Sequence, residues 1–286
     1  MMITEPQLRC YMNLMAMDSL PQSSTGYQGT FEQRMEFLRD SDFDGVQFAD
    51  PGTTEQLSRC RGLGLGIAAS GRVNAPEDAA RLAEKFGGDG YECATLHVGW
   101  GLEGDDEAAR LIEGILAAAQ RWRVPLYIET HRATICQDMW RTVGFVRHFP
   151  DMRFNGDFSH WYTGQEMVYG GFEMKLAFIQ PVLERVRFLH GRIANPGCIQ
   201  VAVDLDAPEK PPYVKHFEQL WTSCFREFLR RAQGGEHICF TPELLAPQIY
   251  YARTFTNKEE SDRWQQSLIL KTVAEHCFLR AKNGER

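Results

Sequence analysis

The segment LYIETHR, residues 126–132, decides the fold, because a short apolar run passes directly into charged and metal-binding side chains. Three later segments repeat this pattern: RFNGDFSHW (153–161), RFLHGRIAN (187–195) and HICFTPELL (237–245). Runs this short cannot be distinguished from buried helix by their periodicity alone. Their order along the chain, and the nature of the segments between them, must therefore decide their structure.

Eight such apolar runs occur, and a segment with helical spacing follows each of them. The runs lie at 10–15, 45–48, 66–69, 94–98, 126–128, 153–155, 186–189 and 237–240. The helical segments include 31–38 after Thr30 as N-cap, 53–60, a start at 75–78, 105–120, 137–148, 172–184, 216–232 and 260–282. This alternation indicates parallel strands, because each crossover needs a helix to return the chain. Eight units predict an α/β fold, a single-domain (β/α)₈ or TIM barrel, over residues 1–286.

An open, doubly wound sheet is the alternative architecture, and periodicity does not exclude it. Such a sheet is expected to carry a glycine-rich dinucleotide turn directly after its first strand. The glycines Gly62, Gly64 and Gly66 resemble that fingerprint, but they precede a strand candidate. The barrel is therefore the better interpretation.

Composition and charge narrow the class of protein. The chain has 43% hydrophobic and 24% charged residues, as is usual for a globular protein. Its formal net charge of −7 argues against a nucleic-acid partner, because phosphate neutralisation needs a basic face. No apolar run approaches the roughly 20 residues that span a bilayer, no signal peptide is visible, and the eight cysteines lack paired spacing. We expect a cytoplasmic protein with reduced thiols and no membrane partner.

The polar residues at the ends of the last four runs predict a metal site. Because the carboxyl ends of barrel strands meet on one face, Glu129, Asp157, His190 and Glu243 should lie together. Three carboxylates and one imidazole suit Mn²⁺, Mg²⁺ or Co²⁺ better than a closed structural zinc site. We predict that these four residues bind one divalent cation, with barrel-mouth ion pairs as the alternative.

Further candidates lie near the same strand ends. His97 lies next to the end of the fourth run, and His131 follows the glutamate of the fifth by two residues. We predict both as substrate contacts, the alternative for each being a neutral, hydrogen-bonded histidine in the barrel mouth. Trp100, Trp161 and Phe48 are expected to form an apolar wall against a substrate.

The ordered set of polar strand ends resembles the xylose isomerase-like barrel superfamily, in its sugar isomerase/epimerase branch. The resemblance covers roughly residues 8–277, and it includes YIETHR…QDMWRT and HGRIANPGCIQV. It implies an enzyme of carbohydrate metabolism that binds one divalent cation through the four predicted ligands. It also implies that Glu129 and Glu243 act as base and acid, transferring a proton on a sugar or related polyhydroxy-carbonyl compound through a metal-stabilised enediolate.

Two more residues gain a role from this resemblance. His160 follows Asp157 by three residues and is close enough to hold a ligand oxygen or a substrate hydroxyl. Arg192 follows His190 by two residues and is expected to bind the substrate, with an ion pair to an acidic neighbour as its alternative. No phosphate cradle is evident, which favours an unphosphorylated sugar or polyol. Relatives often form dimers or tetramers, so a homo-oligomer is compatible with the resemblance.

Three other functions compete with the isomerase or epimerase. A dehydratase on a keto-polyol or inosose-type substrate would use the same metal and one base. DNA-repair endonucleases of this scaffold bind three zinc ions, which need more histidine and aspartate ligands than the sequence offers. A non-catalytic barrel is the third alternative, and the complete ligand set argues against it.

Overall fold

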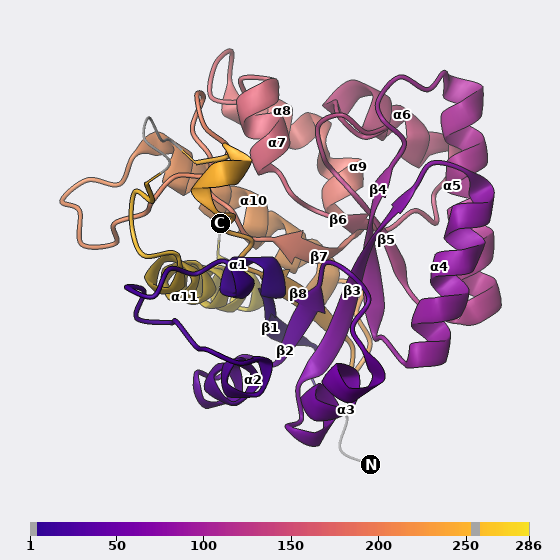
Figure 1. Ribbon diagram of the computed structural model, residues 1–286. Coiled ribbons are helices and arrows are strands. Elements are labelled where there is room, and N and C mark those ends of the chain that lie inside the picture. The colour runs from indigo at the N-terminus through magenta and orange to yellow at the C-terminus, as the bar shows by residue number, and fades with distance from the viewer. Residues whose placement is uncertain (1–4, 253–257, 286) are drawn as a thin grey trace.

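Eight parallel strands close into a barrel in the computed structural model, which describes residues 5–252 and 258–285 (Figure 1). Each strand pairs with the next one in sequence, and β8 pairs with β1. The strands are β1 (Gln7–Asn13), β2 (Gly45–Phe48), β3 (Gly66–Val73), β4 (Cys93–Val98), β5 (Leu126–Glu129), β6 (Phe154–Asn155), β7 (Val186–His190) and β8 (His237–Thr241). The predicted single-domain (β/α)₈ barrel is confirmed.

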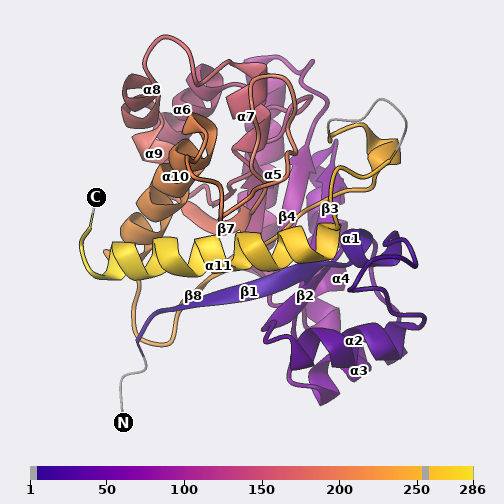
Figure 2. The ribbon, with the colours of Figure 1, turned by 90° about the vertical axis from the view of Figure 1, so that its left-hand side faces the viewer.

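Helices cover the outside of the barrel. The longer ones are α2 (Phe31–Asp40), α3 (Thr54–Gly62), α4 (Pro76–Asp89), α5 (Asp105–Trp122), α6 (Met139–His148), α10 (Pro212–Leu229) and α11 (Arg263–Lys282). The shorter ones are α1 (Leu14–Asp18), α7 (Ser159–Gly164), α8 (Phe172–Phe178), α9 (Gln180–Leu183) and the 3₁₀ turn η1 (Pro247–Ile249). Helix α11 crosses the outside of β1 and β8 beside α10 (Figure 2). Among the described helices, none combines the length and the apolar character needed to cross a membrane.

Several helices begin at residues whose side chains satisfy the first free N–H groups. The Thr30 hydroxyl accepts from the N–H of Gln33, and the Gln33 side chain accepts from the N–H of Thr30. Thr53 and Gln56 form the same capping box at the start of α3. Pro76 occupies the beginning of α4, where its missing N–H breaks no helical hydrogen bond.

Two strands differ from the prediction by more than one residue at their ends. Strand β1 lies three residues earlier at its start and ends at Asn13, whose side chain accepts from the N–H of Met15 and begins α1. Strand β3 continues past Ala69 to Val73, because its last residues pair with β4. The sequence SGR in this extension is polar, yet it lies in the strand and brings Arg72 to the barrel mouth.

The helical segments between β6 and β8 also differ from the prediction. The helix predicted at 172–184 is two helices, α8 and α9, separated at Ile179, and Pro181 lies in the first turn of α9. Helix α10 begins at Pro212 rather than at residue 216, because proline is compatible with the first helical position. Helix α7 was not predicted, since six residues are too few to show a helical period.

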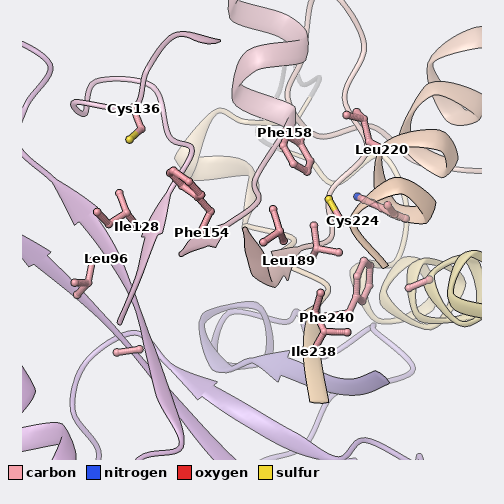
Figure 3. Close-up of a cluster of buried hydrophobic side chains, with 14 of the residues drawn as sticks. Leu96, Ile128, Cys136, Phe154, Phe158, Leu189, Leu220, Cys224, Ile238 and Phe240 are labelled. Carbon is pink, nitrogen blue, oxygen red and sulfur yellow. The ribbon is translucent and has the colours of Figure 1, made fainter. Parts of the chain in front are cut away.

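Strand side chains alternate between the surrounding helices and the barrel interior. Figure 3 shows outward-facing strand residues in the core with Leu220 and Cys224 of α10: Leu96, Ile128, Phe154, Leu189, Ile238 and Phe240. At the end of the barrel where the strands begin, the inward-facing residues form a separate packed cluster of Tyr11, Ala68, Cys93, Tyr127, Phe188 and Cys239. The next inward positions lie two residues further along each strand. They carry the polar side chains of the candidate site.

Candidate metal centre

Four side chains meet at the carboxyl ends of β5 to β8: Glu129, Asp157, His190 and Glu243. Each offers one ligand atom, and these atoms all lie within 4.8 Å of one another. Glu129 and His190 are the last residues of β5 and β7, whereas Asp157 and Glu243 lie two residues beyond β6 and β8. The first three are buried, and the Glu243 side chain is 15% exposed. The structure thus brings together all four predicted ligands in a candidate buried metal site.

The His190 ring is oriented so that Nδ1 faces the carboxylates. Nδ1 lies 3.4 Å from Glu129 Oε2 and 3.3 Å from Glu243 Oε2. On the other side of the ring, Nε2 donates to Gln47 Oε1 at 3.0 Å. A second hydrogen bond of this kind typically fixes the tautomer and the direction of a metal-binding histidine. Nδ1 is therefore the ligand atom that this geometry favours.

Buried amide side chains form hydrogen bonds to Glu129 and His190 from the interior of the barrel. The Asn155 Nδ2 atom donates to Glu129 Oε2 at 3.0 Å and lies 3.0 Å from His190 Nδ1. Gln47 accepts from Asn13 Nδ2 at 3.2 Å and donates to Thr95 Oγ1 at 2.9 Å. The network holds Glu129 and His190 in position without placing a further charge beneath them.

Arg192 is buried between two of the candidate ligands. Its Nη2 atom pairs with Asp157 Oδ2 and lies 3.0 Å from Glu243 Oε2, and its Nη1 atom donates to the Glu243 carbonyl oxygen at 3.3 Å. Its Nε atom donates to Ser159 Oγ at 3.2 Å, and Ser159 in turn binds Asp157 through its N–H and hydroxyl groups. Arg192 therefore positions Asp157 and Glu243, as the predicted ion-pair alternative requires.

Burial and charge act on these groups in opposite directions. Burial favours the neutral imidazole, but the Glu243 and Glu129 carboxylates outweigh it and raise the pKa of His190 to about 9. Burial is likewise outweighed at two carboxylates: His190 lowers the pKa of Glu129, and Arg192 lowers the pKa of Asp157. Burial prevails only at Glu243, whose pKa is raised. Without a cation, the site thus holds a protonated His190 among carboxylates.

The residues of the site fit a divalent cation. Three carboxylates and the Arg192 guanidinium sum to a charge of −2 when His190 is neutral, which one divalent cation balances. The buried Glu129 Oε1 atom has no hydrogen-bond partner within residues 5–252 and 258–285, although buried polar atoms normally have one. Carboxylate oxygens with one imidazole nitrogen are a donor set that suits such ions.

A second, overlapping group consists of His97, Glu129 and His131, whose ligand atoms also lie within 4.8 Å of one another. Its histidines already have other partners. His131 Nδ1 lies 2.5 Å from a backbone carbonyl, and its Nε2 lies 3.3 Å from the Tyr251 hydroxyl. His97 Nδ1 lies 3.2 Å from Arg72 Nη2, and that guanidinium opposes a cation here. The four-residue group is therefore the better candidate.

The structure places all four predicted substrate residues next to the site. His97, His131 and His160 form a row with ring centroids 4.2 and 3.8 Å apart. Burial lowers the pKa of His131 to about 3, which keeps the ring neutral. His97 and His131 remain partly exposed, whereas His160 and Arg192 are buried, and His160 Nε2 lies 3.4 Å from Asp157 Oδ2. Contact of these four residues with a substrate stays a prediction.

A cavity of ≈ 440 Å³ opens above the candidate ligands. Glu129, His190, Glu243, His97 and Arg72 all contribute to its lining. This volume lies within the range of small-molecule sites, which is roughly 300–1,000 Å³. The site is therefore accessible to a small ligand.

The apolar wall predicted from three aromatic residues is wrong. Trp161 is fully buried in α7, and its Nε1 donates to a backbone carbonyl at 2.9 Å. Phe48 is buried against Tyr91, with ring centroids 6.2 Å apart. Only Trp100 is exposed, and the Arg72 guanidinium lies over its ring at 4.0 Å.

Sequence reasoning missed the supporting residues Asn13, Gln47, Thr95 and Asn155, together with Arg72. A signal for some of them exists, because Asn155 and Thr95 lie two residues before Asp157 and His97 and thus face the same side of the strand. Gln47 and Asn13 belong to strands without a predicted ligand, so no such neighbour marks them. Arg72 lies beyond the predicted end of its strand.

The fold and the site define a TIM barrel with a candidate buried metal centre, and comparisons with solved structures agree on the fold. The chain is similar to the "probable 3-DHS dehydratase AsbF" involved in petrobactin synthesis from Bacillus anthracis, with a TM-score of 0.60 and 12% identity over 93% of this chain and 98% of that one. It is also similar to a xylose isomerase-like TIM barrel protein from Mycobacterium smegmatis in complex with magnesium, with a TM-score of 0.51 and 14% identity over 95% and 98% of the two chains.

A third similarity shows that proteins with different functions share the barrel fold. A mutant of xylanase A from P fluorescens subsp. cellulosa, in complex with xylopentaose, matches with a TM-score of 0.51 and 10% identity over 96% of this chain and 98% of that one. No protein-family model matches the chain, and no curated protein matches it. At these identities the likeness concerns the fold, so the function must be argued from the site.

Proposed function

We propose that the protein is a divalent-metal-dependent isomerase or epimerase of a sugar or related polyhydroxy-carbonyl compound. The observation that carries this proposal is the presence of two glutamates in one group of candidate metal ligands. Glu129 and Glu243 each place an oxygen within 3.4 Å of His190 Nδ1, and both line the cavity. Proton transfer at carbon needs one group that removes the proton and one that returns it. Two carboxylates at one cavity supply both.

Each residue of the site has a defined task in this proposal. Glu129, Asp157, His190 and Glu243 hold one Mn²⁺, Mg²⁺ or Co²⁺ ion, which when bound supplies a Lewis acid for a carbonyl oxygen and a neighbouring hydroxyl. The Glu129 carboxylate, which lines the cavity, takes the proton from the carbon next to the carbonyl. Glu243 gives a proton back, to the opposite face in an epimerisation or to the neighbouring carbon in an isomerisation.

A dehydratase is the second candidate function, favoured by the likeness to the "probable 3-DHS dehydratase AsbF". The first step would be the same, since Glu129 again removes the proton next to the carbonyl. The reaction would then expel a β-hydroxyl as water, with Glu243 as proton donor, instead of returning the proton to carbon. A keto-polyol or an inosose-type compound would be the substrate.

Solvent deuterium exchange tests the proposal directly. The metal-loaded protein is incubated in D₂O with a panel of ketoses, inososes and keto acids, and deuterium at carbon is measured by mass spectrometry and NMR. Isomerase or epimerase activity gives deuterium incorporation together with a new isomer. Water loss, followed by ultraviolet absorbance without any new isomer, would promote the dehydratase instead.

Variants identify the residues responsible. Glu129→Gln is expected to abolish exchange, because the amide cannot take up the proton, and Glu243→Gln is expected to abolish formation of the new isomer, because the amide cannot donate a proton. Glu113→Gln, an exposed position on α5, is the matched control and should exchange like the wild type. Exchange that persists in Glu129→Gln, or a new isomer that still forms in Glu243→Gln, would refute the two-glutamate mechanism. Bound metal close to one ion per chain is expected, and three ions per chain would favour endonuclease-like chemistry.

A further inference from the structure

Arg72 places a guanidinium in the same cavity as the candidate metal ligands. It lies near the carboxyl end of β3, is partly exposed, and contributes to the cavity lining with Glu129 and Glu243. His97 alone separates it from the metal site: its Nδ1 lies 3.2 Å from Arg72 Nη2, and its Nε2 lies 3.4 Å from Glu129 Oε1. The positive charge thus lies one imidazole ring away from a candidate ligand.

The loop after β4 holds this guanidinium in a fixed place. Arg72 Nη1 donates to the Gly99 carbonyl at 2.7 Å, and the guanidinium lies over the Trp100 ring at 4.0 Å. The Glu103 carboxylate ties the loop together, because it accepts from the N–H groups of Trp100, Gly101 and Leu102 at 2.7 to 3.1 Å. The Arg72 side chain is therefore positioned before any ligand arrives.

The loop does not supply a direct ion-pair partner, because Glu103 and Glu129 act on the Arg72 charge only from a distance. Within the described part of the chain, no carboxylate lies within ion-pair distance of Arg72, and the two hydrogen bonds above use only two of its five N–H groups. Arg81, which also lines the cavity, differs because it pairs with Asp78 at 3.1 Å. Arg192 differs in the same way, since its charge is matched by two carboxylates. Of the two arginines that line the cavity, Arg72 is the one without an ion-pair partner in the described part of the chain.

We propose that Arg72 binds a carboxylate of the substrate, so that the protein acts on a carboxylated polyhydroxy-carbonyl compound rather than on a neutral sugar. This inference rests on the proposed function, because it places the reacting end of the substrate at the four metal ligands. The planar guanidinium matches a carboxylate, to which it donates two parallel hydrogen bonds. One imidazole ring separates Arg72 from the candidate metal ligands. The substrate carboxylate would therefore lie on the opposite side of a small ring, or at the opposite end of a short chain, from the atoms that react.

A carboxylate fits this position better than a phosphate group. One unpaired guanidinium balances the single charge of a carboxylate. A phosphate carries up to two charges and is usually held by several donors, among them backbone N–H groups of a glycine-rich loop. The N–H groups of the nearby loop, at Trp100, Gly101 and Leu102, are already bound to Glu103.

A pair of probes that differ only in the carboxylate tests this inference. The compounds 3,4-dihydroxybenzoate and 1,2-dihydroxybenzene share a metal-chelating diol, and only the first has a carboxylate. Their dissociation constants are measured by isothermal titration calorimetry on the Mn²⁺-loaded wild type, Arg72→Gln and Arg81→Gln. We expect the acid to bind the wild type at least about tenfold more tightly, as a charged hydrogen-bonded pair provides. This ratio should fall to about one in Arg72→Gln and persist in Arg81→Gln.

The outcomes separate this inference from the function on which it rests. A ratio of about one in the wild type, an unchanged ratio in Arg72→Gln, or no binding of either probe would overturn the carboxylate site. Thermal unfolding of Arg72→Gln verifies that the variant is folded, and Arg72→Lys should restore part of the ratio because it keeps the charge. Removal of the metal should weaken both probes alike. If it weakens neither, the proposed metal function fails, while the carboxylate ratio still reports on Arg72.

Discussion

Replacement of Arg192 by methionine tests how the charges of the candidate metal centre are balanced. The wild-type guanidinium is fully buried and contacts Asp157, Glu243 and Ser159. Methionine has a similar length but no charge, so the variant leaves Asp157 buried without its counter-ion. We expect the metal-free Arg192→Met protein to be markedly less stable than the metal-free wild type.

The size of the loss follows from the burial of the pair. Removing one partner of a buried ion pair costs about 3–5 kcal/mol, because the remaining charge stays out of water. Loss of the guanidinium should also raise the pKa of Asp157, because burial then disfavours its charged form without the compensation that Arg192 provides. A divalent cation should recover part of this loss, since it supplies the missing positive charge beside Asp157 and Glu243.

Urea unfolding followed by tryptophan fluorescence measures both effects, once with EDTA and once with saturating Mn²⁺. The free energy of unfolding should fall by about 3–5 kcal/mol in the metal-free variant, and metal should stabilise the variant more than the wild type. Arg39→Met, which removes a partner of an exposed ion pair, is the control and should change stability little. A metal-free Arg192→Met protein within about 1 kcal/mol of the wild type would refute the assigned role.

Three further predictions follow from the same structure. Gln47→Ala removes the acceptor of His190 Nε2 and should weaken metal binding about 10- to 100-fold, measured by calorimetric titration against the wild type. Because the pKa of His190 is raised to about 9, metal binding below that pH should displace one proton from the histidine, and the metal affinity should fall by up to about tenfold for each pH unit of acidification. Calorimetric titration in buffers of different ionisation enthalpy measures the released proton. A metal affinity that does not change between pH 6 and pH 8 would contradict this prediction. Gly191→Ala places a methyl group 1.9 Å from the Phe240 ring and should lower stability by about 1–3 kcal/mol or more, whereas Gly88→Ala, with no atom within 4 Å, should not.

The barrel could be predicted because each of its layers leaves a pattern in the sequence. Outward-facing strand residues such as Ile128 and Leu189 are apolar because helices cover them, and the helices between strands carry their own apolar face and capping residues. The charged strand ends were equally visible, since a buried parallel strand has no packing reason to end in Glu129 or His190. Order along the chain then placed these ends on one face.

The parts that the sequence did not reveal depend on contacts between distant segments. Strand β3 continues to Arg72 only because β4 offers it a pairing edge, and a single strand cannot show that its neighbour is longer. Trp161 lies near a strand end in the sequence, but the turn into α7 carries it into the core. An aromatic residue next to a ligand therefore says little about which way it faces.

One rule connects most of the residues that build the site. In a barrel strand, positions two residues apart face the interior together, so each ligand is accompanied by the polar residues two positions away. Just beyond the strand ends the same spacing recurs: Asp157 follows Asn155 by two residues, and Arg192 follows His190 across Gly191, where the Phe240 ring leaves no room for a side chain. The pair at His190 and Arg192 matters most, because it brings a positive charge among three carboxylates and reduces their sum to the −2 that a divalent cation balances. In a barrel with a neutral residue in place of Arg192, the three carboxylates and the cation would together carry a net negative charge. A carbonyl oxygen bound to that cation would be harder to polarise. The spacing of His190 and Arg192 is thus as informative about the chemistry of the site as the ligands themselves.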